Sequence, residues 1–548
     1  MSVEPSYRGF RESYLDHDAI TAQLRAWVDA FPQLARLTSL GKTPEGRDLW
    51  LLTVGTEPDR VRPSAWVDGN MHASELCGSS VALQIAEDVL RAHLNPTADN
   101  APLRETLVHV FPRMSPDGAE AVLKTGQYVR SAPRTLGGRG RPWWRSVDVD
   151  GDGQALLMRV PDEGGEFVES KVVPGFMVLR DFGDEGPFYK VWPEGVIEDF
   201  DGHHVPDPTY LSDNDVDFNR QFPYIWRPEH VQFGGGQFPL AGPETRAVVE
   251  FASAHPEIFT WLNLHTFGGV LIRPLGDEPD RKMDPNDLAL YRALGEWGRE
   301  MVGYPMVSGY EEFLYSPDVP VYGDLVDYAF RIAGAVGLTC ELWDLFAQVG
   351  IPAKKPFIDT YLHLSRADFE RIAVWDRDHN ASRVVRPWKH VVHPQLGDVE
   401  VGGLDPRVGI SNPPYEQLGE VCRNVSKLFL RMASLTPQLR VRVERVPGVA
   451  RVIVENHGYL PTNVLGAAKG LAHGGVPWVE VRGATGDRRV AIEHLDGWGR
   501  GRFDGTGAIY FLRSRGNGHR RVVEFACGEG PIDVRVGCPR TGVVTCRA

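Results

Sequence analysis

The spacing of apolar residues changes along this chain, and the change separates two parts that cannot share one kind of fold. Up to about residue 390, short apolar runs such as 48–54 and 259–264 alternate with amphipathic stretches such as 20–28. Alternation of this kind is typical of an α/β domain. From Leu439 onward, apolar residues instead occupy every second position in short runs that are separated by turn residues. That pattern predicts a small antiparallel β-sandwich.

Two stretches between these patterns have a different character. Residues 131–215 are rich in Gly, Pro, Asp and Trp and show weak periodicity, so we expect a long insertion on the surface of the first domain. Residues 391–437 combine a stretch rich in Pro and Gly with a short helix near 417–432, and we expect them to link the domains. The expected division is therefore an α/β domain over 1–390, this linker, and the sandwich over 438–548.

Composition excludes several classes of function. The chain has 59 Lys and Arg against 73 Asp and Glu, a net charge of −14, whereas nucleic-acid binding requires a basic face. It has no run of about 18 apolar residues that would cross a membrane. Its first residues lack the apolar stretch of a secretory signal, and its six cysteines form no CxxC pair. We therefore expect no nucleic-acid or membrane partner and a reduced, cytoplasmic setting, with export by a non-classical route left open.

Three residues with the chemistry of metal ligands lie at the ends of apolar runs. His72 and Glu75 open an expected helix three residues apart, so both lie on one face and can reach one ion. His265 directly follows the apolar run 261–264, and the end of a strand is a rigid place for a third ligand. Two histidines and a glutamate leave the fourth position of zinc open for water, as a catalytic site requires. These residues therefore predict one catalytic Zn²⁺ ion.

Glu341 is the candidate for proton transfer beside this metal. It ends the apolar run 334–340, where a carboxylate that is buried without a partner is costly. Next to a water molecule that zinc activates, the same carboxylate can act as a general base. We therefore expect Glu341 to be catalytic.

These motifs occur together, and in the same order, in one known family. From about Tyr14 to about Leu364 the sequence resembles the zinc carboxypeptidases, which include pancreatic carboxypeptidases A and B. The stretches that carry the resemblance are 41–49, His72 with Glu75, 243–248, His265 with Thr266, and 339–344. The resemblance implies a mixed, twisted sheet flanked by helices in the first domain. It also implies a zinc-dependent hydrolase that removes C-terminal residues from peptides.

The resemblance assigns roles to residues outside the metal set. Arg130 follows a Pro-Asp-Gly motif at 116–118 with the family's spacing, and it corresponds to the arginine that polarises the scissile carbonyl. Asn219 and Arg220 correspond to the pair that binds the C-terminal carboxylate, for which a guanidinium is well suited. Asp217 corresponds to the carboxylate that orients the first histidine. The expected partner is thus a peptide or peptide-like substrate with a free C-terminal carboxylate.

The sequence departs from the pancreatic enzymes near the substrate. Ser74 replaces an arginine, so a contact to the substrate is missing. The family's mobile tyrosine has two candidate replacements, Tyr315 and Tyr322. Val326 falls at the position that selects the C-terminal residue and predicts an apolar or aromatic preference, while the nearby Asp324 and Asp327 keep a basic preference open.

Two alternatives to a carboxypeptidase remain open: an enzyme with another reaction at the same metal site, and a protein without catalytic activity. A zinc amidase or deacylase that acts on a cell-wall peptide or an acylated amino acid would need the same metal ligands, and the long insertion could reshape the cleft for it. A non-catalytic binding protein would retain only the fold. The intact Glu341 and metal ligands argue against that second alternative.

The insertion carries two further candidate features. Asp148, Asp150 and Asp152 alternate with a glycine turn, as in calcium loops. Position twelve of this loop is Arg159 rather than glutamate, so the alternatives are a structural Ca²⁺ site and an acidic turn in solvent. The two tryptophans at 143–144 form either a substrate platform or a buried patch.

Overall fold

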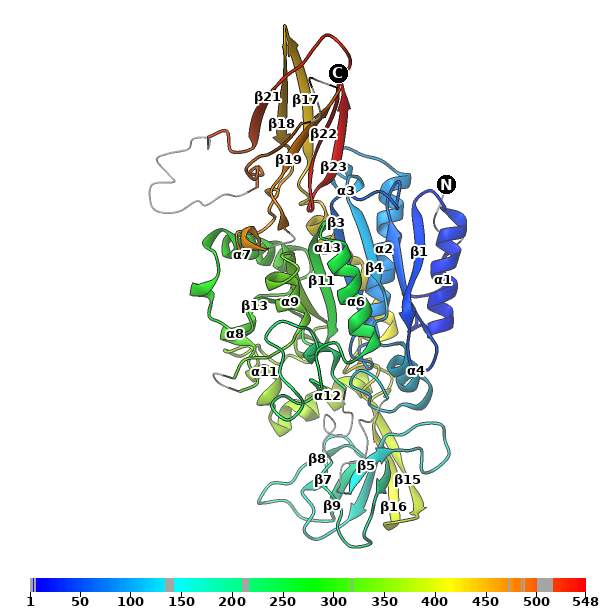
Figure 1. The fold of residues 1–548 in the computed structure, drawn as a ribbon. Coiled ribbons are helices and arrows are strands. Elements are labelled where there is room, and N and C mark those ends of the chain that lie inside the picture. Colours follow the sequence, from blue (N-terminus) through cyan, green and yellow to red (C-terminus); the bar gives the residue numbers. More distant parts are fainter. Residues whose placement is uncertain are drawn as a thin grey trace.

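Figure 1 shows the computed structural model of the chain, which contains an α/β domain, a second sheet beside it and a C-terminal pair of sheets. The structure describes residues 3, 6–133, 142–208, 216–316, 319–471, 474–483, 485, 488–499 and 516–548. Among the helices in these residues, none combines the length and apolar character that crossing a membrane requires.

A mixed sheet of eight strands forms the centre of the α/β domain, as expected, in the order β1-β2-β4-β3-β11-β14-β12-β13. The strands β4, β3, β11 and β14 run parallel to one another, whereas β1, β2 and β12 add antiparallel pairs. Both β3 and β11 are buried along their whole length because both faces of the sheet are covered. The bounds are β1 Ala35–Lys42, β2 Asp48–Val54, β3 Ser64–Gly69, β4 Leu107–Phe111, β11 Ile258–Thr266, β12 Val270–Arg273, β13 Met306–Ser308 and β14 Val336–Leu342.

Helices pack on both faces of this sheet. One apolar core joins it to α1, α2, α7 and α13, and a second core joins it to α6 and α9. These helices are α1 His17–Ala30, α2 Cys77–Leu94, α6 Pro243–Ala254, α7 Pro285–Met301, α9 Leu325–Arg331 and α13 Tyr415–Ala433. The shorter or peripheral helices are α3 Ala101–Arg104, α4 Pro116–Thr125, α8 Gly309–Glu312, α10 Leu345–Gln348, α11 Asp359–Leu362, α12 Arg366–His379, and the 3₁₀ helices η2 Phe218–Arg220, η3 Asp280–Lys282 and η4 Ala467–Gly470.

A second sheet, here called the accessory sheet, is built from two separate stretches of the chain (Figure 1). Its order is β15-β16-β6-β9-β7-β8 with antiparallel neighbours, and the pair β5–β10 packs with it in one small core. Strands β5 to β10 come from the expected insertion, whereas β15 and β16 follow the α/β domain in sequence. The bounds are β5 Trp143–Ser146, β6 Leu157–Pro161, β7 Phe167–Glu169, β8 Met177–Leu179, β9 Phe188–Pro193, β10 Gly195–Glu198, β15 Val385–His393 and β16 Gly397–Leu404.

The structure differs from the linker expected over 391–437. Strand β16 lies in the accessory sheet between β15 and β6, and α13 packs against α2 in the main core. Residues 405–414, rich in Pro, have the composition of a linker. The elements on either side nevertheless bury apolar side chains, such as Val401 in β16 and Leu428 in α13. Both elements therefore belong to the folded body.

The C-terminal region contains two antiparallel sheets, as the alternating pattern predicts, in the orders β17-β18-β21 and β20-β19-β22-β23. Their apolar faces share one core. The buried guanidinium of Arg540 donates to the backbone carbonyls of Pro256 and Ile258 at 2.8 and 3.0 Å, which docks this region against the start of β11. The bounds are β17 Leu439–Val446, β18 Val449–Asn456, β19 Trp478–Arg482, β20 Arg488–Ala491, β21 Arg520–Ala526, β22 Asp533–Cys538 and β23 Gly542–Arg547.

Candidate metal centre and substrate pocket

The candidate residues meet at one edge of the central sheet, because the parallel strands β3, β11 and β14 end there together. His265 and Glu341 are partners in register at the ends of β11 and β14, so their side chains emerge on the same face. Strand β3 leads into the loop that carries His72 and Glu75 before α2 begins. The carboxyl edge of such a sheet is where α/β proteins commonly place ligands.

Local contacts fix the loop between β3 and α2. The side chain of Asn70, which has a φ of +56°, donates from Nδ2 to the carbonyls of His72 and Ala73 at 2.8 and 3.0 Å. A Cβ atom on Gly69 would lie 2.5 Å from the carbonyl group of Gly78, so only glycine lets the strand end approach α2 this closely. The loop is therefore a rigid support for two ligands.

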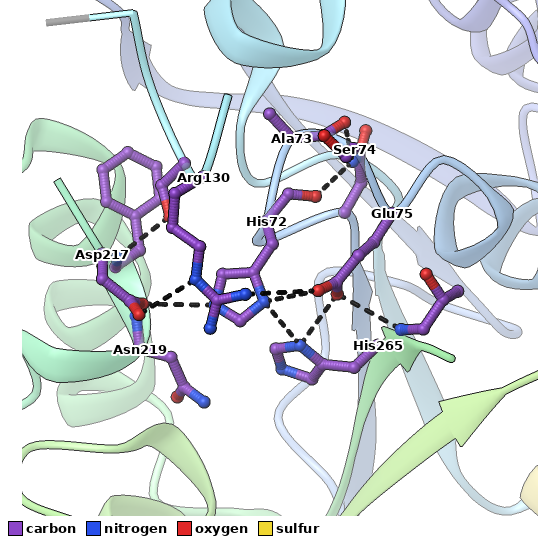
Figure 2. A network of polar contacts seen from close by, with 12 residues as sticks. His72, Ala73, Ser74, Glu75, Arg130, Asp217, Asn219 and His265 are labelled. Atoms are coloured by element: carbon purple, nitrogen blue, oxygen red, sulfur yellow. Dashed lines mark hydrogen bonds and ion pairs between the residues drawn. The ribbon is translucent and has the colours of Figure 1, made fainter. Parts of the chain in front are cut away.

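The ligand atoms of the three predicted metal residues converge (Figure 2). His72 Nδ1 lies 2.7 Å from Oε1 of Glu75, and His265 Nδ1 lies 2.9 Å from Oε2 of the same carboxylate. The two Nδ1 atoms are 3.0 Å apart. All three side chains are buried, and the structure brings the three residues predicted from the sequence together in one group that could hold a metal ion.

The second nitrogen of each histidine has its own acceptor. His72 Nε2 lies 3.2 Å from Oδ1 of Asp217, and His265 Nε2 lies 2.6 Å from Oδ1 of Asn263. Protons on both Nε2 atoms leave lone pairs on the Nδ1 atoms, which then face each other and a carboxylate. Such a set repels itself unless a cation lies within it, and imidazole with carboxylate is a donor set that zinc prefers. The residues present therefore fit a zinc ion.

Asn263 is part of this centre although the sequence prediction omits it. Its Nδ2 donates to Oδ1 of Asp68 at 2.5 Å, while the indole N–H groups of Trp66 and Trp261 donate to Oδ2 at 2.8 and 2.6 Å. Burial raises the pKa of Asp68 to about 6, and these three donors oppose that rise. The one signal in the sequence is a polar residue two positions before His265, on the same face of an otherwise apolar strand.

Asp217 connects the metal ligands to the substrate side of the site (Figure 2). Its carboxylate contacts Nε2 of His72 and accepts hydrogen bonds from Nε of Arg130 at 3.1 Å and from the backbone N–H of Asn219 at 2.8 Å. The guanidinium of Arg220 lies 4.0 Å away. Burial alone would raise the pKa of Asp217, but Arg130 and Arg220 hold it well below its usual value. Asp217 therefore stays charged and holds His72, Arg130 and Asn219 in place.

One pocket of about 310 Å³ collects these groups. The predicted residues on its wall are His72, Glu75, Arg130, Asn219, Arg220, His265, Tyr315, Val326 and Glu341. Of the two candidate tyrosines, Tyr322 is absent from the described residues of this wall, and its ring instead lies 4.9 Å from the guanidinium of Arg227. The geometry therefore favours Tyr315 as the tyrosine that can reach a substrate.

The part of the pocket around Val326 has mixed polarity. Ile272 is another apolar residue that lines the pocket, but the buried Asp324 also lines it. Oδ1 of Asp324 accepts a hydrogen bond from the backbone N–H of Asp327 at 2.9 Å, and burial raises the pKa of Asp324 to about 6. The apolar preference that Val326 predicts therefore stays a prediction, with an acidic group close by.

The Glu341 carboxylate lies in the same pocket, next to His265 on the neighbouring strand. No hydrogen bond from another described residue engages it. Burial raises the pKa of Glu341 to about 8, and a divalent cation at the adjacent ligands would lower it again. A carboxylate placed in this way is suited to accept and return a proton near neutral pH.

The three aspartates of the acidic loop also lie together, with carboxylate oxygens within 4.8 Å of one another. Their own loop supplies several donors: the N–H groups of Gly151 and Gly153 bond to Asp148 at 2.7 and 2.8 Å. Lys389 of β15 forms an ion pair with Asp150 at 3.0 Å. The loop is thus closed without an ion, and a calcium site there stays a prediction.

Comparison with known proteins agrees with this geometry. The sequence model of the zinc carboxypeptidase family matches residues 20–150 and 203–355, which is more than half of the chain. The chain belongs to the zinc carboxypeptidase family. Both matched ranges together contain the three metal ligands, Arg130, Asp217 and Glu341.

Individual relatives match shorter stretches. Carboxypeptidase M of Mus musculus is 30% identical over 118 residues, which is 21% of this chain and 27% of that protein. A zinc carboxypeptidase of Saccharothrix mutabilis subsp. capreolus is 32% identical over 125 residues, 22% of this chain and 27% of that protein. The alignments thus span about a quarter of the length of these relatives.

Solved structures resemble the chain more loosely. Thrombin activatable fibrinolysis inhibitor is 13% identical with a TM-score of 0.45, and the match covers 78% of this chain and 76% of that one. The murein-tripeptide amidase MpaA of Escherichia coli O157 is also 13% identical, with a TM-score of 0.28 and coverage of 62% and 97%.

Replacement of Asn263 tests how the centre is held. We predict that Asn263→Ala lowers the zinc affinity about 10–100-fold, because His265 then loses the acceptor that fixes its tautomer. Competition with a chromogenic chelator measures the change. The exposed Asn286 on α7 offers a matched control, and Asn286→Ala should leave the affinity unchanged. Equal affinities for wild type and Asn263→Ala would show that Asn263 does not position the ligand.

Proposed function

We propose that this chain is a zinc-dependent metallocarboxypeptidase that removes single residues from the free carboxyl end of peptides. The observation that carries the proposal is the placement of Asn219 and Arg220 in the pocket that also holds the metal ligands and Glu341. A cationic guanidinium in the same pocket as a hydrolytic centre suits a substrate whose carboxylate lies one residue beyond the bond to be cut.

The groups at the carboxylate end are oriented by the fold. Oδ1 of Asn219 accepts a hydrogen bond from the backbone N–H of Leu325 at 2.9 Å, so the amide presents its Nδ2 donor on the other side. The guanidinium of Arg220 donates from NH1 to the carbonyl of Asn219 at 2.8 Å, which fixes its direction. Together the two side chains offer N–H donors to a carboxylate.

The groups at the scissile bond divide the chemistry. When bound, zinc lowers the pKa of water and polarises the carbonyl. Glu341 takes a proton from the attacking water and returns it to the leaving amine. Nε of Arg130 is held by Asp217, and NH1 lies 3.7 Å from Oε1 of Glu75, so the guanidinium lies beside the metal ligands, where it can stabilise the oxyanion that develops on the carbonyl oxygen. The positions of Glu341 and Arg130 in the pocket support these two proposed roles.

Replacing the carboxylate of Glu341 by an amide of the same shape tests its role as the general base. We predict that Glu341→Gln lowers kcat about 10²–10⁴-fold while zinc content, measured by plasma mass spectrometry, stays at one ion per chain. Glu300→Gln, on the exposed side of α7, is the matched control and should retain full activity. Near-normal turnover by Glu341→Gln would exclude this residue as the base.

A peptide pool supplied with free or amidated C-termini tests the exopeptidase itself. We predict stepwise loss of single residues from the free acids and no reaction with the amides, measured by mass spectrometry. Arg220→Gln should lower kcat/KM for the free acids about 10–100-fold, because a charge-assisted hydrogen bond to the carboxylate is lost. Arg227→Gln, which changes an exposed arginine outside the pocket, should not.

The same experiment separates the amidase or deacylase alternative. That alternative uses the same zinc ligands and does not require the carboxylate contact of Arg220. Equal cleavage of free and amidated substrates, or release of an acyl group from an acylated amino acid with no trimming of peptides, would support it over the carboxypeptidase.

The acidic loop is a second, structural proposal. If Asp148, Asp150 and Asp152 hold Ca²⁺, adding this ion should raise Tm by about 2–4 °C, because an ion that binds the folded state alone stabilises it. Differential scanning calorimetry measures the shift, which Asp148→Asn should remove and Asp207→Asn, in the exposed loop after β10, should not. An unchanged Tm on addition of Ca²⁺ would leave the loop as an acidic turn.

A further inference from the structure

A second pocket opens off the active-site pocket on the side of the accessory sheet. It has a volume of about 590 Å³. Four residues line both pockets: Ser74, Tyr128, Val129 and Ser411. The second pocket therefore adjoins the pocket that holds the metal ligands, and the chemistry proposed above uses only the first of the two.

Much of the wall of this second pocket lies outside the residues that match the zinc carboxypeptidase family. These parts are 155–157 with the start of β6, Pro193 at the end of β9, and the stretch 404–411 that follows β16. Trp143 and Trp144 of β5 lie on the same wall, within the matched residues. The pocket thus exists because the insertion and the end of β16 fold together beside the active site.

Hydrogen bonds of Asn412 join the stretch after β16 to the loop that carries His72 and Glu75. Asn412 donates from Nδ2 to the carbonyl of Ser74 at 2.7 Å and accepts at Oδ1 from the backbone N–H of Cys77 at 2.9 Å. The same Nδ2 also bonds to the carbonyl of Arg407 at 2.8 Å. These bonds join the stretch after β16 to the loop that carries Glu75, so the two pockets hold a fixed position relative to each other.

The second pocket adjoins the first at residues other than the carboxylate-binding pair. It meets the first pocket at Ser74 and Val129, the neighbours of Glu75 and Arg130 in sequence. Asn219, Arg220 and Val326 line the first pocket and, among the described residues, have no part in the second. A peptide whose carboxylate is held at Arg220 would therefore extend its amino side past Arg130 into the second pocket.

The second pocket offers apolar surface and no uncompensated charge from its described residues. Its wall includes Trp143, Leu156, Leu157, Pro193 and Leu404. A desolvated charged group would lose its hydration here without gaining a partner, whereas an apolar or aromatic group would gain burial.

The two arginines on this wall are already paired. Nε and NH2 of Arg407 bond to the two carboxylate oxygens of Asp405 at 2.9 and 2.7 Å. Arg145 forms an ion pair with Glu198 of β10, and its side chain is 53% exposed. Neither guanidinium is available as a specific anion site, so the apolar surface decides what binds.

We propose that this second pocket is an acyl-side subsite that binds an apolar or aromatic side chain on the amino side of the scissile bond. The proposal rests on the carboxypeptidase function proposed above and names the class of peptide that the enzyme selects. Ser74 is compatible with the proposed subsite, because it lines both pockets and its small side chain leaves room for a peptide to pass from one to the other. Trp143, with Leu156 and Leu157 nearby, then forms the platform on which the side chain packs.

Kinetics with matched peptides test the subsite on the full-length, zinc-loaded protein. The substrates are N-acetylated tetrapeptides that share one C-terminal residue. Each peptide carries one Phe or one Asp at one of the three positions before that residue, and Ala occupies the other two positions. We expect Phe to raise kcat/KM about tenfold or more over Asp at one or more of these positions, because a buried aromatic side chain is favoured over a desolvated charge.

Variants locate the preference in the pocket. Leu157→Ala and Trp143→Ala should reduce the Phe-to-Asp ratio at least about threefold. Leu179→Ala is the matched control, because Leu179 is an exposed leucine of the same accessory sheet and lies outside the pocket. A variant that simply folds poorly would lower kcat/KM for both peptides together and leave their ratio at the wild-type value.

Each outcome bears on the proposal. A high ratio in the wild type that falls in Leu157→Ala and Trp143→Ala and persists in Leu179→Ala supports the subsite. Equal rates for Phe and Asp peptides, or a ratio that neither pocket variant changes, overturns it and leaves the carboxypeptidase function standing. Failure to cleave any of the peptides overturns the carboxypeptidase function, and the subsite with it.

Discussion

The carboxylate of Asp217 is the contact on which the geometry of the site depends. Burying a charge is expensive unless it is paired and hydrogen-bonded, and here four groups offset the cost: His72, Arg130, Arg220 and the backbone N–H of Asn219. In the proposed function, each of these groups has its own task at the metal, the carbonyl or the substrate carboxylate. One buried anion thus sets the relative positions of three parts of the site.

The order of strands explains why this site lies where it does. The chain passes from β3 to β4 on one side, while β11 lies on the other side of β3. At such a reversal the connections leave the sheet in opposite directions and open a crevice at the carboxyl ends of the strands. The metal ligands come from the two strands that border this crevice, and Glu341 comes from the next strand outward. Segments that are far apart in the sequence therefore meet without any long loop having to reach across the sheet.

The sequence could indicate the candidate residues whose chemistry is visible locally. His265 and Glu341 are polar residues at the ends of apolar runs, and they give weight to His72 and Glu75, whose three-residue spacing is weak evidence by itself. The structure places His72 and Glu75 in the loop before α2 and not on the helix that this spacing predicts. The general fold class also follows from the sequence, because alternating strand-like and helical stretches predict the α/β domain and apolar residues at every second position predict the C-terminal sheets. Asn263 could not be singled out, because its role depends on a pairing with Asp68 that only the register of β3 and β11 creates. The same limit applies to 391–437, where β16 finds its partner in β6, more than two hundred residues earlier. The choice between Tyr315 and Tyr322 depends on loop geometry, which spacing alone does not determine.

The accessory sheet has a consequence for how this protein can be altered. Strand β16 is bonded to β15 on one edge and to β6 on the other, and only β6 belongs to the insertion. The insertion is therefore not a detachable cassette. Excising it would leave β16 with an open, partly apolar edge beside the active site, of the kind that pairs with strands of other molecules. Any shortened version of this protein would have to lose β15 and β16 as well, or carry a new strand to close that edge.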